Sequence, residues 1–254
     1  MNRRATATAK ARMQRTGEPS TRLSPAAAHT GFALIVLHIL TSPYALDDAG
    51  SLFSVSTQAL FYGLLIFVLI DVATHRSQVI ACITLVAIST AIRLLSDPGH
   101  GVLRATAGWA LVLCGLMILY LAMRRILVTR RVDPALISGT VSVYLLAGVT
   151  WAVAFHAIEQ AVPGSYALPG QAAAAPSDLF YFSFVTLTTL GYGDIRPVSG
   201  LARTSAVLEA VFGQIFLVVL LGRLVSLQIS TQKQNPAPTP SAEKSALSEG
   251  QDEI

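Results

Sequence analysis

The chain has 254 residues, of which 53% are hydrophobic and only 13% are charged, and it carries a net charge of +4. A water-soluble domain carries about a quarter charged residues, so this composition argues against a soluble protein and predicts a chain that lies mostly in a lipid bilayer. Basic residues gather in segments 2–22 and 124–131 without interleaved aromatic residues, so we expect no nucleic-acid partner, and nothing indicates a soluble ligand.

Apolar stretches recur along the chain. A bilayer-spanning helix needs about 20 mostly apolar residues, and the candidates are 25–42, 52–73, 78–95, 102–127, 136–158 and 202–229. The first is the weakest, because it is short and contains His29 and His38. Cys82 and Cys114 lie inside apolar stretches at a spacing that signals neither a metal site nor pairing, so we expect them to be small core residues.

The charges of the loops predict the orientation of these spans. Segment 1–24 holds six basic residues and one acid, the loop after the first span holds two acids and no base, and the loop after the fourth span holds four arginines. Because cytoplasmic loops are enriched in Lys and Arg, we expect a multi-pass protein of the plasma (cell inner) membrane with both termini cytoplasmic. An organelle transit peptide in segment 1–24 is the alternative.

A further apolar segment, 177–189, lies between the fifth and sixth spans and is too short to cross a bilayer. A loop rich in proline and glycine precedes it, and its start, Pro176-Ser177-Asp178, has residue types that begin a helix. We therefore expect a re-entrant helix of about three turns that enters the membrane region and stops at the following glycines. Irregular backbone at this depth is tolerated only where protein buries it or where it lines a water-filled cavity.

The loop after this helix reads Thr-Leu-Gly-Tyr-Gly-Asp, residues 189–194. Glycine reaches positive φ without steric cost, so glycines at every second position allow the backbone to alternate in handedness. Such a backbone can turn successive carbonyls to one side, where they and the Thr189 hydroxyl replace the hydration shell of a small cation. The side chains of Leu190 and Tyr192 would then point outward and pack against the re-entrant helix.

The stretch FSFVTLTTLGYGD, residues 182–194, resembles the pore helix and selectivity filter of the potassium channel family, and the resemblance extends over residues 136–229. It implies potassium-selective conduction through a homotetramer in the lipid bilayer, because the filter of that family needs four loops and this chain has one. The filter would comprise Thr189, Leu190, Gly191, Tyr192 and Gly193, with K⁺ bound at the first four of these residues. Asp194 would lie at its outer mouth.

The resemblance assigns further roles by position. Tyr181 and Phe182 stand where the family has aromatic residues that support the filter, with Thr188 beside them. On the last span, Gly213 matches the gating-hinge glycine and Gln214 would face the water-filled cavity. Helical spacing continues that face as an apolar stripe, suited to closing by dewetting, through Leu217 and Leu221.

Two departures from the family pattern modify these expectations. Leu190 stands where valine or isoleucine is usual, which leaves a less selective cation channel as an alternative. A non-conducting channel-like subunit that keeps the fold but lacks flux is a separate alternative. The fourth span carries no charge between Arg104 and Arg124. Moving one charge across the membrane is worth about 2.3 kcal/mol per 100 mV, and steep gating needs several such charges, so we expect weak or absent voltage dependence.

Glu209 is an acid within the sixth span, where acids are costly and indicate a functional or structural site. At 100° per residue it lies roughly 140° around the helix from Gln214, so we expect it to face the re-entrant helix, held by a hydroxyl of Ser183, Thr186 or Thr188, in a structural or modulatory role. No pattern of an enzyme or of a bound cofactor is present in the sequence, and K⁺ is expected only as the permeant ion.

The expected fold class is an all-α membrane protein with six transmembrane helices, a re-entrant pore helix and a filter loop. The expected organisation has four parts: a basic cytoplasmic segment (1–24), a four-span domain that resembles a voltage sensor without gating arginines (25–131), a pore domain (132–229) and a disordered cytoplasmic tail (230–254).

Overall fold

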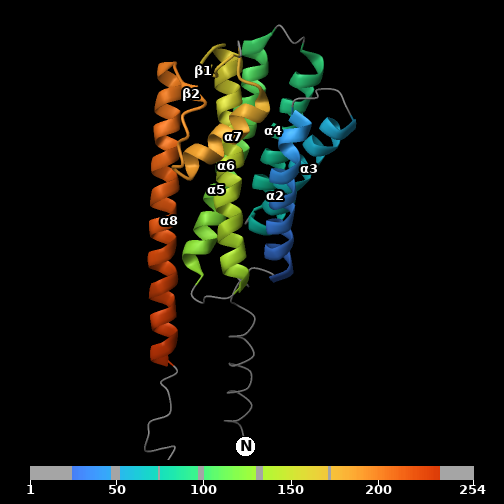
Figure 1. Cartoon of the computed structure of the whole chain (residues 1–254). Helices are drawn as coiled ribbons and strands as arrows, with labels where there is room; N and C mark the ends of the chain where they lie inside the picture. Colours follow the sequence, from blue (N-terminus) through green and yellow to red (C-terminus); the bar gives the residue numbers. More distant parts are fainter. Residues whose placement is uncertain are drawn as a thin grey trace, which may run out of the picture.

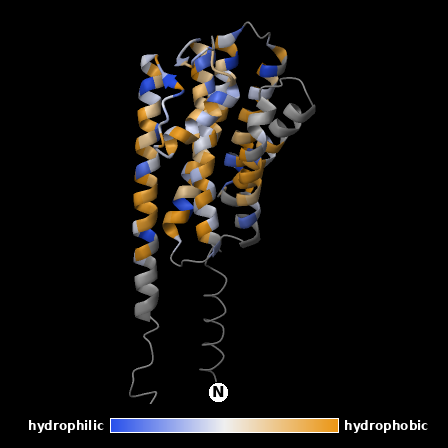
Figure 2. Ribbon diagram, in the orientation of Figure 1, coloured by the Kyte–Doolittle hydropathy of each residue, from blue (hydrophilic) through white to orange (hydrophobic). Residues whose placement is uncertain are grey.

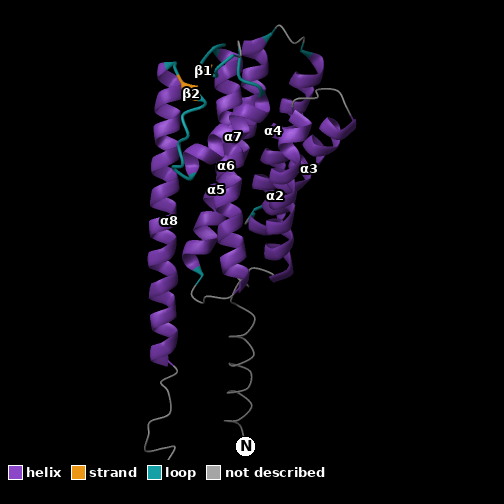
Figure 3. Cartoon of the chain, viewed as in Figure 1, coloured by secondary structure: helices purple, strands orange, loops and turns teal. Residues whose placement is uncertain are grey.

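The computed structural model describes residues 25–46, 52–73, 75–96, 100–129, 134–170 and 173–234, so the expected N-terminal segment and most of the expected tail lie outside the described residues. These residues are mostly helical (Figure 3). The helices are α2 (Pro25–Leu46), α3 (Leu52–Val72), α4 (Arg76–Leu95), α5 (Gly101–Val128), α6 (Pro134–Ala161), α7 (Pro176–Leu187) and α8 (Gly200–Gln234). Two short strands, β1 (Tyr166–Ala167) and β2 (Arg196–Pro197), pair antiparallel.

Four helices of the described residues are long and apolar enough to cross a bilayer, through segments Arg76–Arg93, Gly101–Val128, Leu136–Ala161 and Gly200–Arg223. Their apolar character extends along most of their length (Figure 2). The described parts of α2 and α3 contain shorter apolar stretches, His29–Ile39 and Leu60–Ile70. The protein is therefore a multi-pass membrane protein, and the six-span topology remains a prediction. Helix α8 continues to Gln234, past the expected end of the pore domain, because no proline or glycine interrupts it there.

Helices α5 and α6 lie side by side, and α8 stands beside them with the short α7 crossing between (Figure 1). Glycines on α5 allow the close approach of α6. A Cβ added at Gly115 would lie 2.7 Å from the Thr150 Oγ1 atom, and one added at Gly108 would lie 2.8 Å from the Ala157 Cβ atom. Because interiors are packed to near-crystalline density, a side chain at either position would force these helices apart.

One hydrophobic core runs through α2, α3, α4, α5, α6 and α8, with Ile35, Leu64, Ile118, Leu146 and Phe216 among its buried members. The expected four-span domain and the expected pore domain therefore share a packed interior. Cys82 of α4 and Cys114 of α5 are free and buried in this core, as expected, but their Sγ atoms lie 2.8 Å apart. Their separation in sequence gave no sign of this contact, which arises from the packing of α4 on α5.

Candidate functional site

Helix α7 is the element that positions the predicted filter. It has 12 residues, which at 1.5 Å per residue gives a length of about 18 Å, well short of the roughly 30 Å of a bilayer core. Proline at its first position suits a helix start, because the missing N–H has no partner there in any case. The Asp178 carboxylate accepts a hydrogen bond from the Ala175 backbone N–H at 2.9 Å, which satisfies a donor just before the helix.

Aromatic packing holds α7 in place on two sides. Phe182 is buried against Phe155 of α6 and Tyr166 of β1, with ring centroids 5.1 and 5.4 Å away. On another side, Phe180 meets the buried His38 of α2 edge-on, with centroids 6.3 Å apart. The structure thus places Phe182 in a cluster with α6 and β1, and the expected support of Tyr192 by Phe182 remains a prediction.

The C-terminus of α7 closes with a hydrogen-bond pattern that leads directly into the predicted filter. The Leu190 N–H donates to the Val185 carbonyl at 2.9 Å, and the Thr189 N–H donates to the Thr186 carbonyl at 2.9 Å. These two bonds close the end of the helix in a Schellman motif, in which the first residue beyond the C-cap adopts a left-handed conformation. Its left-handed residue is Thr189, with φ of 58°.

Positive φ angles recur at every second residue of the loop. They are 58° at Thr189, 57° at Gly191 and 78° at Gly193. The two glycines were expected to adopt this conformation, but a β-branched residue rarely does, so the strain at Thr189 is a feature that the glycine spacing did not indicate. Strain of this kind persists where surrounding contacts hold it, here the two hydrogen bonds at the end of α7.

The whole loop from Thr188 to Asp194 is exposed in the single chain. The side chains of Leu190 and Tyr192 are 55% and 67% exposed, so α7 of the same chain does not bury them as the sequence suggested. Thr188 donates its hydroxyl to the Phe184 carbonyl at 2.7 Å within the last turn of α7. The loop is therefore open on one side in the single chain.

The segment after the loop is fastened to α7 and to β1. The Tyr181 hydroxyl donates to the Asp194 Oδ2 atom at 2.9 Å, and the Ile195 N–H donates to the Asp194 Oδ1 atom at 3.0 Å. The β1–β2 pairing then joins this segment to the loop that follows α6, with Tyr166 opposite Pro197. Asp194 is therefore fixed by both carboxylate oxygens.

The Tyr181–Asp194 contact predicts an alkaline titration. The pKa of Tyr181 is raised, first because its hydroxyl donates a hydrogen bond to the Asp194 carboxylate, and further by burial and by nearby negative charge. A phenol whose pKa is raised on folding retains this contact fully below its unfolded value of about 10 and loses it as the pH rises through the higher folded value. We expect the ultraviolet difference between wild type and Tyr181→Phe to show tyrosinate formation above pH of about 10.

The matched variant for this titration is Asp194→Asn, which keeps the shape of the side chain but removes its charge. It should move the Tyr181 titration back toward the ordinary value for tyrosine. A Tyr181 signal that titrates identically in wild type and in Asp194→Asn would contradict the contact.

Helix α8 lines the other side of α7 with three residues that the sequence singled out. Glu209 is fully buried, and its Oε1 atom lies 2.5 Å from the Ser183 Oγ atom of α7. Gly213 packs against the end of α7, where an added Cβ would lie 2.3 Å from the Leu187 carbonyl oxygen. The Gln214 amide reaches the Thr189 hydroxyl at 3.4 Å, so it lies at the inner end of the loop.

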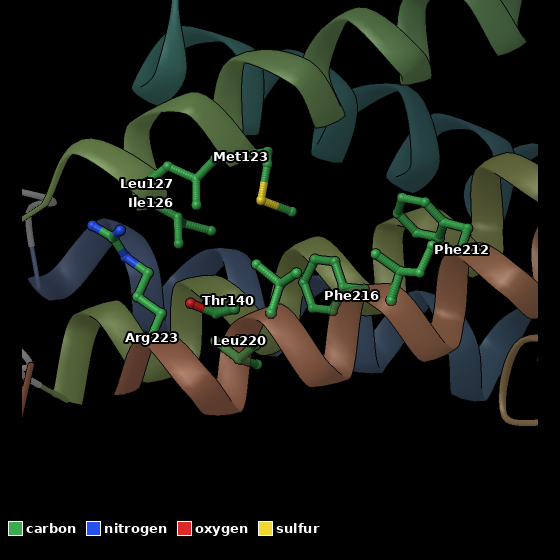
Figure 4. A pocket seen from close by; sticks show the side chains of 10 residues that line it. Met123, Ile126, Leu127, Thr140, Phe212, Phe216, Leu220 and Arg223 are labelled. Atoms are coloured by element: carbon green, nitrogen blue, oxygen red, sulfur yellow. The ribbon is translucent and has the colours of Figure 1, made fainter. Parts of the chain in front are cut away.

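The apolar stripe predicted on α8 is largely uncovered in the single chain, since both Leu217 and Leu221 are exposed. Beside it, facing α5 and α6, lies a cavity of about 240 Å³ (Figure 4). At one end of the cavity, the Arg223 guanidinium donates to the Thr129 carbonyl at 2.6 Å, which ties α8 to the end of α5. The side chains that line it are Met123, Ile126, Leu127, Thr140, Phe212, Ile215, Phe216, Val219, Leu220 and Arg223.

Comparison with known proteins shows what this part of the chain is similar to. Residues 140–229, which contain most of α6, all of α7, the loop and most of α8, match the family model described as an ion channel. Over these residues the chain is similar to ion channels, and this likeness points to a channel rather than an enzyme. The curated relatives narrow this likeness further, to potassium channels.

Three of these relatives show the extent of the likeness. The inward rectifier potassium channel Kirbac3.1 of Paramagnetospirillum magnetotacticum is 36% identical over 90 residues, which are 34% of this chain and 27% of the relative. Two pore potassium channel c of Oryza sativa subsp. japonica is 33% identical over 90 residues, which are 35% and 19% of the two chains. Two-pore potassium channel 4 of Arabidopsis thaliana is 43% identical over 56 residues, which are 22% and 20%.

The matched part of the chain thus spans about a quarter or less of the length of these relatives. No solved structure gives a significant match. The family model matches residues 140–229, and residues 25–128 lie outside that match.

Proposed function

We propose that the protein conducts potassium ions passively and selectively through a homotetrameric pore. The observation that carries the proposal is the alternation of positive φ at Thr189, Gly191 and Gly193, directly after a buried helix too short to span the membrane. Rings of backbone carbonyls that replace the hydration shell of K⁺ are the established basis of selectivity in such loops. The resident ion is the cargo itself, and the proposal requires no cofactor.

The tetramer follows from the geometry that such a filter needs. One chain supplies one loop, and that loop is exposed along one side together with much of α8. Four copies around a common axis would cover this side and bring four sets of carbonyls together, with Gln214 below the loop and Leu217 and Leu221 along the inner pore. Lipid would cover the outer faces of the remaining helices.

The proposed topology has six spans, both termini in the cytoplasm and the loop facing outward, in the plasma membrane. Helix α5 carries no charge between Arg104 and Arg124, so gating by membrane potential would be weak. The division into a four-span domain (25–131) and a pore domain (132–229) belongs to the same proposal, with close packing of the two through α5 and α6.

The test is ion flux in proteoliposomes that contain the purified full chain. Flux of potassium and rubidium but not sodium, blocked by barium, is the expected result. Equal sodium flux would instead support the alternative of a less selective cation channel, in which the exposed Leu190 side chain loosens the filter. A Leu190→Val variant tests this alternative, because it should restore discrimination against sodium only if Leu190 is what loosens the filter. Absence of flux under all conditions of voltage and pH would favour a non-conducting subunit.

A further inference from the structure

Where α6, α7 and α8 meet, one serine hydroxyl lies within hydrogen-bond distance of two other oxygen atoms. The Ser183 Oγ atom lies 2.7 Å from the Gly148 carbonyl oxygen of α6 and 2.5 Å from the Glu209 Oε1 atom of α8. Both Ser183 and Glu209 are fully buried. A single side chain of α7 therefore connects both of the helices that flank it.

The number of hydrogens in this chain of contacts decides the charge of Glu209. A serine hydroxyl has one hydrogen to donate, and a carbonyl oxygen and an ionised carboxylate can only accept. With Glu209 ionised, two acceptors would face one hydrogen, and one of the two close contacts would be repulsive. With Glu209 protonated, it donates to Ser183, Ser183 donates to Gly148, and each contact contains one hydrogen.

The surroundings of Glu209 also favour the neutral form. Its Oε2 atom is buried and has no hydrogen-bond partner among the described residues, and none of those residues forms an ion pair with it. A buried carboxylate charge without a counter-ion is strongly disfavoured. The titratable groups that face it are Tyr144 of α6 and Tyr166 of β1, both acids rather than bases, while α7 presents the uncharged Ser183.

The position of this carboxyl connects it to the loop. Ser183 precedes Val185 and Thr186, whose carbonyls hold the strained start of the loop. One turn beyond Glu209, Gly213 touches the Leu187 carbonyl, and from the other side the Tyr144 hydroxyl donates to that same carbonyl at 3.2 Å. A change in the link at Glu209 would therefore shift α8 against the part of α7 that carries the filter.

We propose that Glu209 is a proton-binding site whose neutral carboxyl ties α8 to α7 through Ser183, and that loss of this proton releases the tie and lowers conduction. Glu209 is thus a positioning residue for the filter. The protonation of Glu209 does not depend on whether the protein conducts ions, whereas its effect on flux rests on the proposed function. Alkaline solution is the condition that removes the proton.

Infrared spectroscopy of the full chain in lipid vesicles tests the proton directly. The wild type at neutral pH should show the carbonyl stretch of a protonated carboxylic acid, and Glu209→Gln should lack it. Glu159→Gln is the matched control. Glu159 is also buried and its Oε2 atom likewise has no hydrogen-bond partner among the described residues, but its Oε1 atom accepts a hydrogen bond from the Gly164 N–H at 2.8 Å, a contact that already contains one hydrogen. A band that is absent from the wild type, or that persists in Glu209→Gln, would overturn the assignment whether or not the protein conducts.

Potassium flux as a function of pH tests the link. We expect wild-type flux to fall by about tenfold in alkaline solution, the scale of effect for leaving a buried polar group unpaired. Glu209→Gln keeps an N–H donor toward Ser183 that cannot be titrated, so its flux should match the wild type at neutral pH and stay constant as the pH rises. Identical pH profiles for the two proteins would overturn the positioning role even where the infrared band supports the proton.

Discussion

Replacement of Gly191 by alanine is expected to abolish potassium flux while leaving the chain folded. At Gly191 φ is 57°, and an added Cβ would meet nothing within 4 Å in the single chain, so within one chain the effect arises from backbone conformation rather than from a clash. A left-handed conformation costs an ordinary residue about 1–2 kcal/mol. In a tetramer that cost is paid in all four loops, and relaxation of the backbone toward negative φ would rotate the carbonyl groups that the proposed mechanism requires.

Gly170→Ala is the matched control for this variant. Gly170 has φ of 78° in the loop before α7 and is likewise free of neighbours within 4 Å of an added Cβ. Alanine there carries a similar conformational cost, so it should lower the thermal unfolding temperature to a similar extent but preserve flux. Rubidium uptake and thermal unfolding, measured on both variants, separate the two effects. Retention of selective flux in Gly191→Ala would contradict the role of this loop as the filter.

Gly213→Ala is expected to destabilise the fold, because the new Cβ would lie 2.3 Å from the Leu187 carbonyl oxygen and 3.1 Å from its Cδ1 atom. Backbone cannot move aside cheaply, and forcing extra atoms into a packed interior typically costs about 1–3 kcal/mol. Helix α8 would have to shift away from α7, so we expect a lower unfolding temperature together with reduced flux. The resemblance to potassium channels assigns Gly213 a hinge role instead, and the two roles predict different results.

Gly222→Ala on the same helix provides the comparison. An added Cβ at Gly222 meets nothing within 4 Å, and alanine has the higher helix propensity by about 1 kcal/mol, so this variant should unfold at the same temperature or higher. If Gly213 served only as a hinge, Gly213→Ala would also keep its unfolding temperature and alter only the open probability. Equal unfolding temperatures for the two variants would therefore reject the packing role.

The sequence predicted those elements that depend on local pattern. The start of α7 at Pro176 and the left-handed glycines at 191 and 193 follow from residue types whose conformational preferences are strong. Thr189 could not be predicted in the same conformation, because its own preference opposes it and only the hydrogen bonds at the end of α7 hold it there.

Contacts between helices lie beyond this local pattern. Helical spacing indicated that Glu209 faces away from Gln214 and offered three hydroxyl partners, but selecting Ser183 required the relative position of α7 and α8. For the same reason the sequence could not reveal the contact of Cys82 with Cys114, or the approach of Gly213 to the Leu187 carbonyl. Each depends on the distance and rotation between two helices, which composition and spacing do not determine.

The hydrogen bonds at the two ends of the predicted filter loop have a consequence for its length. At one end, the N–H groups of Thr189 and Leu190 are bonded to the last turn of α7, and at the other, Arg196 and Pro197 are paired with β1. The residues between them form a bridge between two anchored points. A free surface loop accommodates an inserted or deleted residue by shifting the chain on either side of it. Here both sides are hydrogen-bonded, so the backbone between the two anchored points would have to change its own conformation. The number of residues in the loop is therefore constrained as strongly as their identity.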